Sequence, residues 1–244
     1  MTLGLAFLDA ALSFGPPPAD AVRVDDVLGK PIALVVALAL VSLVPFVFMG
    51  VTAFVKISTV LQIVRSAIGA QGVPSNTVIM ALATALTLIA MAPVGQRIFD
   101  RAAPLLNKPS GKEDTTALIE KGVDAVREPM REFLEKNSSE KERNRFFIVA
   151  KNARTEAERA KLGPTDLTVL VPAFVVTELT EAFAIGFLVF LPFLIIDLVV
   201  ANVLLALGMQ MLNPTQVSLP FKLLLFVAID GWGLLAQALV SGYR

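Results

Sequence analysis

Apolar residues run through most of this chain in long stretches that carry no charge. Residues 31–55, 66–96, 182–196 and 198–221 contain no Asp, Glu, Lys or Arg. A membrane-spanning helix needs about 20 mostly apolar residues, and the first two stretches meet that length. The pattern predicts an all-α, membrane-associated protein in which long hydrophobic helices form two hairpins.

The first hairpin covers residues 31–96. Its helices are expected at Ile32–Val55 and Thr77–Met91, with the second ending near Pro93, because proline removes a helix donor. The connecting segment carries Lys56 and Arg65 and no acid, so the positive-inside rule places this loop in the cytoplasm. Both ends of the hairpin then face outward.

The second hairpin covers residues 167–244. Its outgoing arm, Leu167–Leu207, would be about 60 Å long as one helix, twice the roughly 30 Å of bilayer hydrocarbon. It must therefore tilt, break or lie partly outside lipid. A turn at 208–216 follows, favoured by Gly208 and Asn213-Pro214, and Val217–Tyr243 returns as the second arm.

A charged segment separates the hairpins. Residues 97–166 hold 28 of the 42 charged side chains, which predicts a soluble helical insert, periplasmic by the topology above. Ser139 followed by Glu142 suits the start of one of its helices. The N-terminal segment, residues 1–30, resembles a weak secretory signal, but it lacks a positive n-region and Asp9 interrupts its apolar part.

Composition excludes several function classes. The 21 basic and 21 acidic residues balance, so no field favours nucleic acid. Without cysteine or histidine, the chain lacks the commonest metal ligands and general base, and no catalytic motif occurs. We therefore expect no enzyme activity, no metal site and no cofactor.

Ionisable residues within the second hairpin are the first candidate functional group. They are Glu178, Glu181, Asp197, Lys222 and Asp230. A charge at the bilayer centre costs about 2.5–3.5 kcal/mol on insertion scales, so such residues normally find partners. Antiparallel packing would bring Lys222 beside an acid of the outgoing arm or of a neighbouring subunit. Two roles stay open: buried charge pairs that fix assembly, or a proton relay in a transporter.

The turn between the two arms is the second candidate. It reads Gly208, Met209, Gln210, Met211 and Leu212. Methionine is flexible and polarisable, and in apolar sequence it most often fills core gaps. A ring of such turns around an axis would instead make a deformable hydrophobic seal, and the sequence leaves both alternatives open.

Several motifs resemble those of the FliP/SctR family. They are Val171-Pro172-Ala173-Phe174, Ile185-Gly186-Phe187, Leu191-Pro192-Phe193, Leu207-Gly208-Met209, Ser218-Leu219-Pro220-Phe221-Lys222 and Asp230-Gly231-Trp232, with Phe54-Val55-Lys56-Ile57-Ser58 and Val73-Pro74-Ser75-Asn76 in the first hairpin. The likeness covers about residues 46–95 and 167–243. It is weaker in the insert and absent from the N-terminus.

The resemblance implies a core subunit of the type III protein export gate of bacterial flagella and injectisomes. It implies a homo-pentamer that joins FliQ/SctS-type and FliR/SctT-type gate subunits and an FlhB/SctU-type switch protein. The assembly lies at the inner membrane, in contact with lipid and largely on its periplasmic side, and passes unfolded polypeptides.

By the same resemblance, residues 208–212 form a Met gasket around the substrate path. From the argument that buried charges find partners, we expect Glu178, Asp197, Lys222 and Asp230 to be buried charges that hold subunits in register. Gln210 departs from the all-Met run common in the flagellar branch. Together with Phe54-Val55-Lys56-Ile57-Ser58 and Val73-Pro74-Ser75-Asn76, this departure favours the injectisome branch. The rivals are a proton-coupled transporter that uses Glu178, Glu181 and Asp197, and an intramembrane enzyme, for which no nucleophile–base pair is found.

Overall fold

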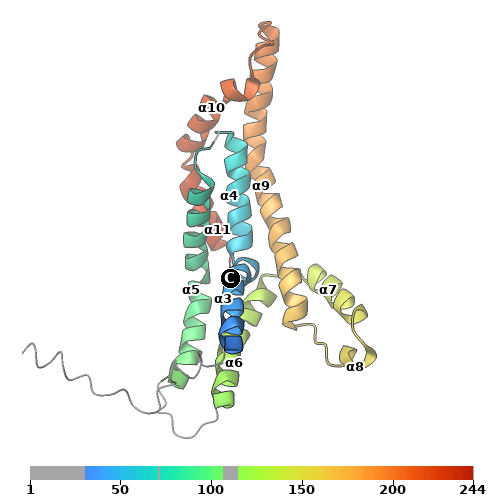
Figure 1. Ribbon diagram of the computed structural model, residues 1–244. Coiled ribbons are helices and arrows are strands. Elements are labelled where there is room, and N and C mark those ends of the chain that lie inside the picture. Colours follow the sequence, from blue (N-terminus) through green and yellow to red (C-terminus); the bar gives the residue numbers. More distant parts are fainter. Residues whose placement is uncertain (1–30, 71, 107–114, 244) are drawn as a thin grey trace, which may run out of the picture. The chain divides into compact units, whose positions relative to one another are not determined.

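The computed structural model describes residues 31–70, 72–106 and 115–243, and all regular elements in these ranges are helices (Figure 1). The predicted all-α class is confirmed. The segment 1–30, with its signal-like start, lies outside the described residues. The helices are α3 (Pro31–Val51), α4 (Phe54–Ile68), α5 (Asn76–Leu106), α6 (Thr115–Lys136), α7 (Glu140–Asn152), α8 (Glu156–Arg159), α9 (Leu167–Ala206), α10 (Pro214–Ala228) and α11 (Gly231–Ser241).

The chain divides into two units at Phe46 and Val47. The described part of the first unit, residues 1–46, is helical from Pro31 onward and exposes apolar side chains such as Leu38 and Phe46. The second unit, Val47–Arg244, contains the remaining helices and both hydrophobic clusters. The features described below belong to the second unit.

Helix α4 is the centre of the larger hydrophobic cluster. It lies between α5 and α9 (Figure 1), and it buries one side of its surface through Ile57, Val60, Leu61 and Val64. Those residues recur at helical spacing, so their burial follows from the pattern. The segment that was expected to be a loop between two spans is therefore a core helix.

Helix α5 does not end near Pro93, and that expectation is wrong. It continues through Pro93 to Leu106. Pro93 lies on the exposed side of the helix. The carbonyl of Pro93 accepts a hydrogen bond from Arg97 Nε at 3.3 Å.

A second cluster joins the extended end of α5 to α6 and α9. Its buried residues are Val94, Phe133, Leu134, Leu170 and Phe174. Arg97 Nη1 also pairs with Glu132 Oε2 of α6 at 3.0 Å. The charged segment that begins at residue 97 therefore packs against the apolar helices from its first turn.

The segment after α6 is attached to α9 by polar contacts. Ser139 caps α7, since its Oγ accepts from the Glu142 amide at 3.3 Å. The Ser139 amide in turn donates to Thr177 Oγ1 of α9 at 3.0 Å. These bonds hold the start of α7 beside the first third of α9.

Helix α9 is one continuous helix of 40 residues, despite Pro172 and Pro192 within it. Of its most apolar 18-residue window, only 11% is buried. Helices α9 and α5 are long and apolar enough to cross a membrane, and two bent helix pairs bring the candidates to four within the described residues. The returning arm is one such pair, because α10 and α11 meet at a bend of 58° near Asp230.

Candidate functional site: two buried ion-pair clusters and an apolar turn

The first cluster joins α4 to α9 near their N-terminal ends. Lys56 is only 5% exposed and Glu178 is fully buried. The Lys56 Nζ lies 3.0 Å from Glu178 Oε1 and 2.7 Å from Glu181 Oε2. One ammonium group thus faces two carboxylates, of which Glu181 has a side chain that is 53% exposed.

Tyr243, close to the C-terminus, completes this cluster. Its hydroxyl donates to Glu178 Oε2, and the Lys56 Nζ lies 4.5 Å from the centre of its ring. The ring also stacks on Phe133 with centroids 6.0 Å apart. Burial raises the pKa of the Tyr243 phenol and the neighbouring Glu178 carboxylate raises it further, so the hydroxyl stays protonated and acts as a donor.

The second cluster joins α9, α10 and the end of α4. The Lys222 Nζ lies 2.6 Å from Asp197 Oδ2 and donates to the Ala67 carbonyl at 3.2 Å. The Ser218 hydroxyl donates to the other oxygen of Asp197. Of the two partners that the sequence left open for Lys222, the structure shows the acid of the outgoing arm.

The remaining singled-out charges lie apart from these clusters. Asp230 is exposed rather than buried, at the N-cap of α11, where its backbone adopts the left-handed conformation with φ 52°. Arg65 is half-buried on α4, and within the described residues no carboxylate pairs with it. The placement of the connecting segment in the cytoplasm was based on Lys56 and Arg65. Because Lys56 is buried rather than in a solvated loop, only Arg65 still supports that placement.

The turn after α9 is closed by backbone hydrogen bonds. The Met209 amide donates to the Leu204 carbonyl at 2.9 Å and the Gly208 amide donates to Leu205 at 3.1 Å, with Gly208 at φ +72°. This is the Schellman arrangement, in which glycine accepts a left-handed conformation at little cost. Asn213 then caps α10 through its side chain, which accepts from the Thr215 amide at 3.0 Å.

The side chains of this turn point outward. Met211 is 100% exposed and Met209 is 46% exposed, and Gln210 and Leu212 are exposed as well. Of the alternatives for the two methionines, filling the core of their own subunit is excluded. The turn presents an apolar tip with one amide between two thioethers.

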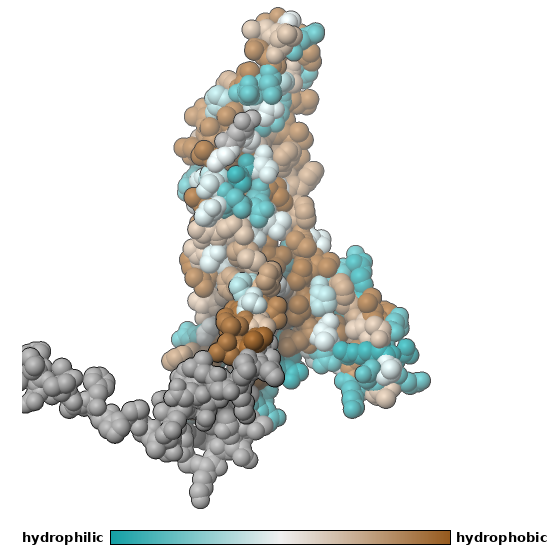
Figure 2. All heavy atoms as spheres, viewed as in Figure 1, coloured by the Kyte–Doolittle hydropathy of each residue, from teal (hydrophilic) through white to brown (hydrophobic). Residues whose placement is uncertain are grey.

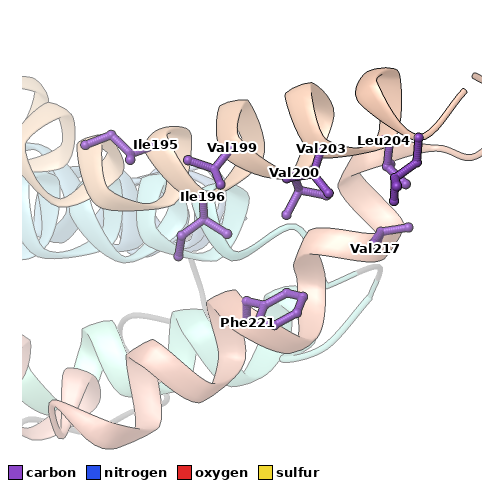
Figure 3. Close-up of a pocket in the computed structure, with 9 residues that line it drawn as sticks. Ile195, Ile196, Val199, Val200, Val203, Leu204, Val217 and Phe221 are labelled. Atoms are coloured by element: carbon purple, nitrogen blue, oxygen red, sulfur yellow. The ribbon is translucent and has the colours of Figure 1, made fainter. Parts of the chain in front are cut away.

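An apolar groove of about 570 Å³ continues from this tip between α9 and α10. Its lining has no polar residue, and Figure 3 shows side chains of both helices directed toward the gap. The residues are Ile195, Ile196, Val199, Val200, Val203, Leu204, Leu207, Val217 and Phe221. Figure 2 shows apolar residues over much of the visible surface above the insert.

The described residues were also compared with the usual ligand sets of metal sites. In the ranges that the structure describes, no three His, Cys, Asp or Glu side chains gather in a group that would hold a metal ion.

Comparison with known proteins gives the family. The model of the FliP family matches residues 37–239, which is most of the chain. This chain belongs to the FliP family.

Curated relatives agree with the family match. The chain is 46% identical to "Pathogenicity-related ORF2" of Xanthomonas campestris pv. glycines, over 86% of this chain and 96% of the relative. It is 44% identical to the "Hypersensitivity response secretion protein HrcR" of Ralstonia nicotianae, over 87% and 97%. It is 38% identical to the "Flagellar biosynthetic protein FliP" of Bacillus subtilis, over 88% and 93%.

For this FliP-family chain, sequence reasoning missed two parts of the first cluster. Lys56 was assigned to a loop, although a lysine among apolar residues at helical spacing is a signal for a buried partner. Tyr243 was not singled out at all. It is the only tyrosine of the chain, but nothing in the sequence connects it to a glutamate 65 positions away.

Proposed function

We propose that this protein is a core subunit of the type III protein export gate and forms part of the entrance channel through which unfolded polypeptides cross the inner membrane. Family membership supports this function, as do relatives named for secretion and flagellar biosynthesis. The identities of 46% and 44% to a pathogenicity-related and a hypersensitivity response protein, against 38% and 41% to two flagellar ones, favour the injectisome branch.

The exposed turn carries the channel part of the proposal. Fully exposed Met211 and half-exposed Met209 stand at the end of a 40-residue helix, where water would otherwise surround them. Flexible thioether side chains from several copies would close a pore yet deform around a passing chain. Gly208 and Leu212 hold the two ends of this gasket, and Gln210 adds a hydrogen-bonding group to its rim.

The exposed apolar surface supports assembly with other hydrophobic subunits. Contiguous apolar patches larger than a few hundred Å² on a protein normally mark a partner or a membrane. The α9–α10 groove and the outer side of α9 would be covered by further copies in a homo-pentamer, by FliQ/SctS-type and FliR/SctT-type subunits, by an FlhB/SctU-type switch protein, and by lipid. In this arrangement residues 97–166 face the periplasm.

The ion-pair clusters fit a structural role in this gate. Glu178 and Asp197 each bind a lysine of the same chain, so these charges fix the register of α4, α9 and α10 within one subunit. Four charges were expected to lie between subunits. Of these, Asp230 is exposed, and it could therefore contact a neighbouring subunit. A proton relay is the rival function, and it predicts transport by the purified chain alone.

Replacement of the gasket methionines tests the proposal. The double variant Met209→Ala, Met211→Ala removes most of the apolar volume of the tip, so cells with the complete gate should become permeable to small ions or solutes. Met49→Ala is the matched control, since Met49 is 43% exposed but lies outside the turn. Membranes as tight as those with the unaltered chain would contradict the gasket.

A further inference from the structure

One side of α4 is not covered by the other helices of the chain. It carries three polar residues, each two positions after a buried one, and two positions correspond to about 200° around a helix. The polar residues are Thr59, Gln62 and Ser66, and the buried ones are Ile57, Val60 and Val64. Gln62 and Ser66 are exposed, and Thr59 is half-buried. The polar stripe of α4 therefore points away from the core.

A groove of about 300 Å³ runs along this stripe between α4 and α9. Its lining consists of Thr59, Gln62, Ile63 and Ser66 from α4 and of Phe183 and Phe190 from α9. Phe183 is 62% exposed, so the α9 edge of the groove is open. The Gln62 amide reaches only the sulfur of Met80, at 4.0 Å. The groove thus offers an apolar wall, an uncharged polar wall and a weakly bonded amide.

Helix α11 carries a second stripe of the same kind. Its buried residues are Gly231, Leu235 and Leu239, and the residues two positions after them are Gly233, Gln237 and Ser241, all of them exposed. Within the described residues the side-chain amide of Gln237 has no hydrogen-bond partner, and the Ser241 hydroxyl donates to the Gln237 carbonyl at 2.7 Å. Each stripe therefore has one exposed amide between two small residues.

Such stripes are typical of contacts between helices in apolar surroundings. Gly, Ser and Thr let two backbones approach closely, and Gln forms hydrogen bonds from one helix to the other. An amide that loses water to an apolar partner without a new hydrogen bond is costly. The groove therefore favours an uncharged helix with small residues and an amide at the height of Gln62.

Helix α11 runs antiparallel to α4. At the start of α11, Trp232 lines an apolar cavity together with Ile68 from the end of α4. Just after the end of α11, the Tyr243 hydroxyl lies 3.2 Å from the carbonyl oxygen of Ala53, which comes just before α4. The two helices therefore extend over the same levels of the molecule in opposite directions.

The two stripes consequently lie at the same height. Gln237 follows Trp232 by five residues and Gln62 precedes Ile68 by six, so the two amides differ by only about 1.5 Å along the helices. The small residues match as well, because each lies three or four positions from its glutamine. In antiparallel order the pairs at equal height are Ser66 with Gly233, Gln62 with Gln237, and Thr59 with Ser241.

The stripes also point to opposite sides of one copy. The buried sides of α4 and α11 belong to the same hydrophobic cluster, which contains Val64 and Leu235 among others. Since each stripe lies opposite the buried side of its own helix, the core stands between them. Gln62 and Gln237 of one copy therefore cannot meet, whereas those of two neighbouring copies can.

We propose that the outer stripe of α11 in one copy packs into the α4–α9 groove of the next copy, with Gln237 of the first hydrogen-bonded to Gln62 of the second. Copies inserted in one membrane orientation are related by rotation about the membrane normal, which preserves height, so the two stripes meet in register. The contact is heterologous, and it repeats into a ring or a helix. The inference rests on the proposed gate function and specifies how its copies join.

Cysteine crosslinking tests this contact, because the chain has no cysteine of its own. A double variant, Gln62→Cys with Gln237→Cys, is expressed with the complete set of gate genes and treated with a short bis-maleimide. Both positions are exposed, so the fold of a single copy should not depend on them. The expected result is a ladder of crosslinked species beyond the dimer, because each copy takes part in two contacts.

Matched variants separate the outcomes. Each single variant should give no ladder, and a mixture of Gln62→Cys chains with Gln237→Cys chains should stop at the dimer. The control pair is Leu188→Cys with Gln237→Cys. Leu188 is 67% exposed and follows Gly186, which packs on Ile63, by two residues, so it lies at the height of the groove but on the far side of α9. An equal ladder from the control pair, or crosslinks from Gln62→Cys only to a different subunit, would overturn the proposal.

A dilution series followed by native mass spectrometry gives a readout without a crosslinker. Gln237→Ala should weaken the association of copies about three- to twentyfold, which is the range for hydrogen bonds between membrane helices. Gln237→Trp overfills the groove and should weaken it further, whereas Leu188→Trp should leave it unchanged. An oligomer unaffected by Gln237→Trp would refute the contact while leaving the gate function intact. If the unaltered chain forms no oligomer with the complete set of genes, the contact and the gate function fail together.

Discussion

At the scale of single residues, the two buried lysines are the features that hold the helices in place. Lys56 and Lys222 each provide the positive charge for a carboxylate on α9. A buried pair contributes an uncertain net free energy, but removal of one partner leaves a buried charge without compensation. These residues therefore fix register, and their loss is costly.

Substitution of Lys56 by alanine should lower the free energy of unfolding by about 3–5 kcal/mol, because Glu178 stays fully buried without its ammonium partner. Thermal unfolding in detergent measures the change. Arg101→Ala is the control, since both side chains of the Arg101–Glu132 pair are more than a third exposed and the pair should contribute at most about 1 kcal/mol. Equal effects of the two substitutions would contradict the assignment.

Substitution of Tyr243 by phenylalanine should cost about 1–3 kcal/mol, since the buried Glu178 Oε2 loses its hydroxyl donor while the ring stack on Phe133 remains. Tyr243→Ala removes the ring as well and should cost more. The same unfolding assay compares the two variants. If Tyr243→Phe is as stable as the unaltered chain, the hydroxyl does not serve Glu178.

At the scale of elements, the close approach of α4 and α9 depends on a glycine. A Cβ at Gly186 would lie 2.5 Å from Ile63 Cδ1 and 2.9 Å from its Cγ2. The two helices run parallel at this point, with Lys56 beside Glu178 at one end and Ala67 beside Lys222 and Asp197 at the other. A separation of the helices at Gly186 would strain both ion-pair clusters.

Gly186→Ala should therefore destabilise the protein by about 1–3 kcal/mol through overpacking. Gly95→Ala is the matched control inside α5, where a Cβ meets nothing within 4 Å. There alanine should be neutral or stabilising by up to about 1 kcal/mol, because it is the better helix former. Unfolding midpoints that do not separate the two variants would show that the helices part without cost.

The lengths of apolar runs and the helical spacing of apolar residues account for part of the helix arrangement. The length of α9 follows from its long apolar run. The spacing of Val60 and Val64 accounts for the buried face of α4, although that segment was expected to be a loop. The continuation of α5 through Pro93 and the break at Asp230 depend on tertiary packing, which local rules do not contain. The pairing of Lys56 with Glu178 joins positions 122 residues apart, so spacing alone gave no access to it.

At the scale of the whole molecule, a single copy of the chain leaves much apolar surface exposed. Large apolar side chains such as Phe183, Phe187 and Leu188 are exposed along α9, and the tip of the hairpin exposes Met211 completely. Exposed surface of this kind is stable only when lipid or other subunits cover it. Composition already indicated a hydrophobic partner, while the identity of the family came from motifs and not from physical pattern.

Native mass spectrometry tests the central claim, that this chain is an assembly subunit of an export gate, most directly. The chain is expressed with and without its neighbouring genes and released from membranes in detergent. The account predicts a five-fold species that also contains two small hydrophobic proteins when the neighbours are present. A chain that stays monomeric with the neighbours present, and that moves protons when reconstituted alone, would contradict it.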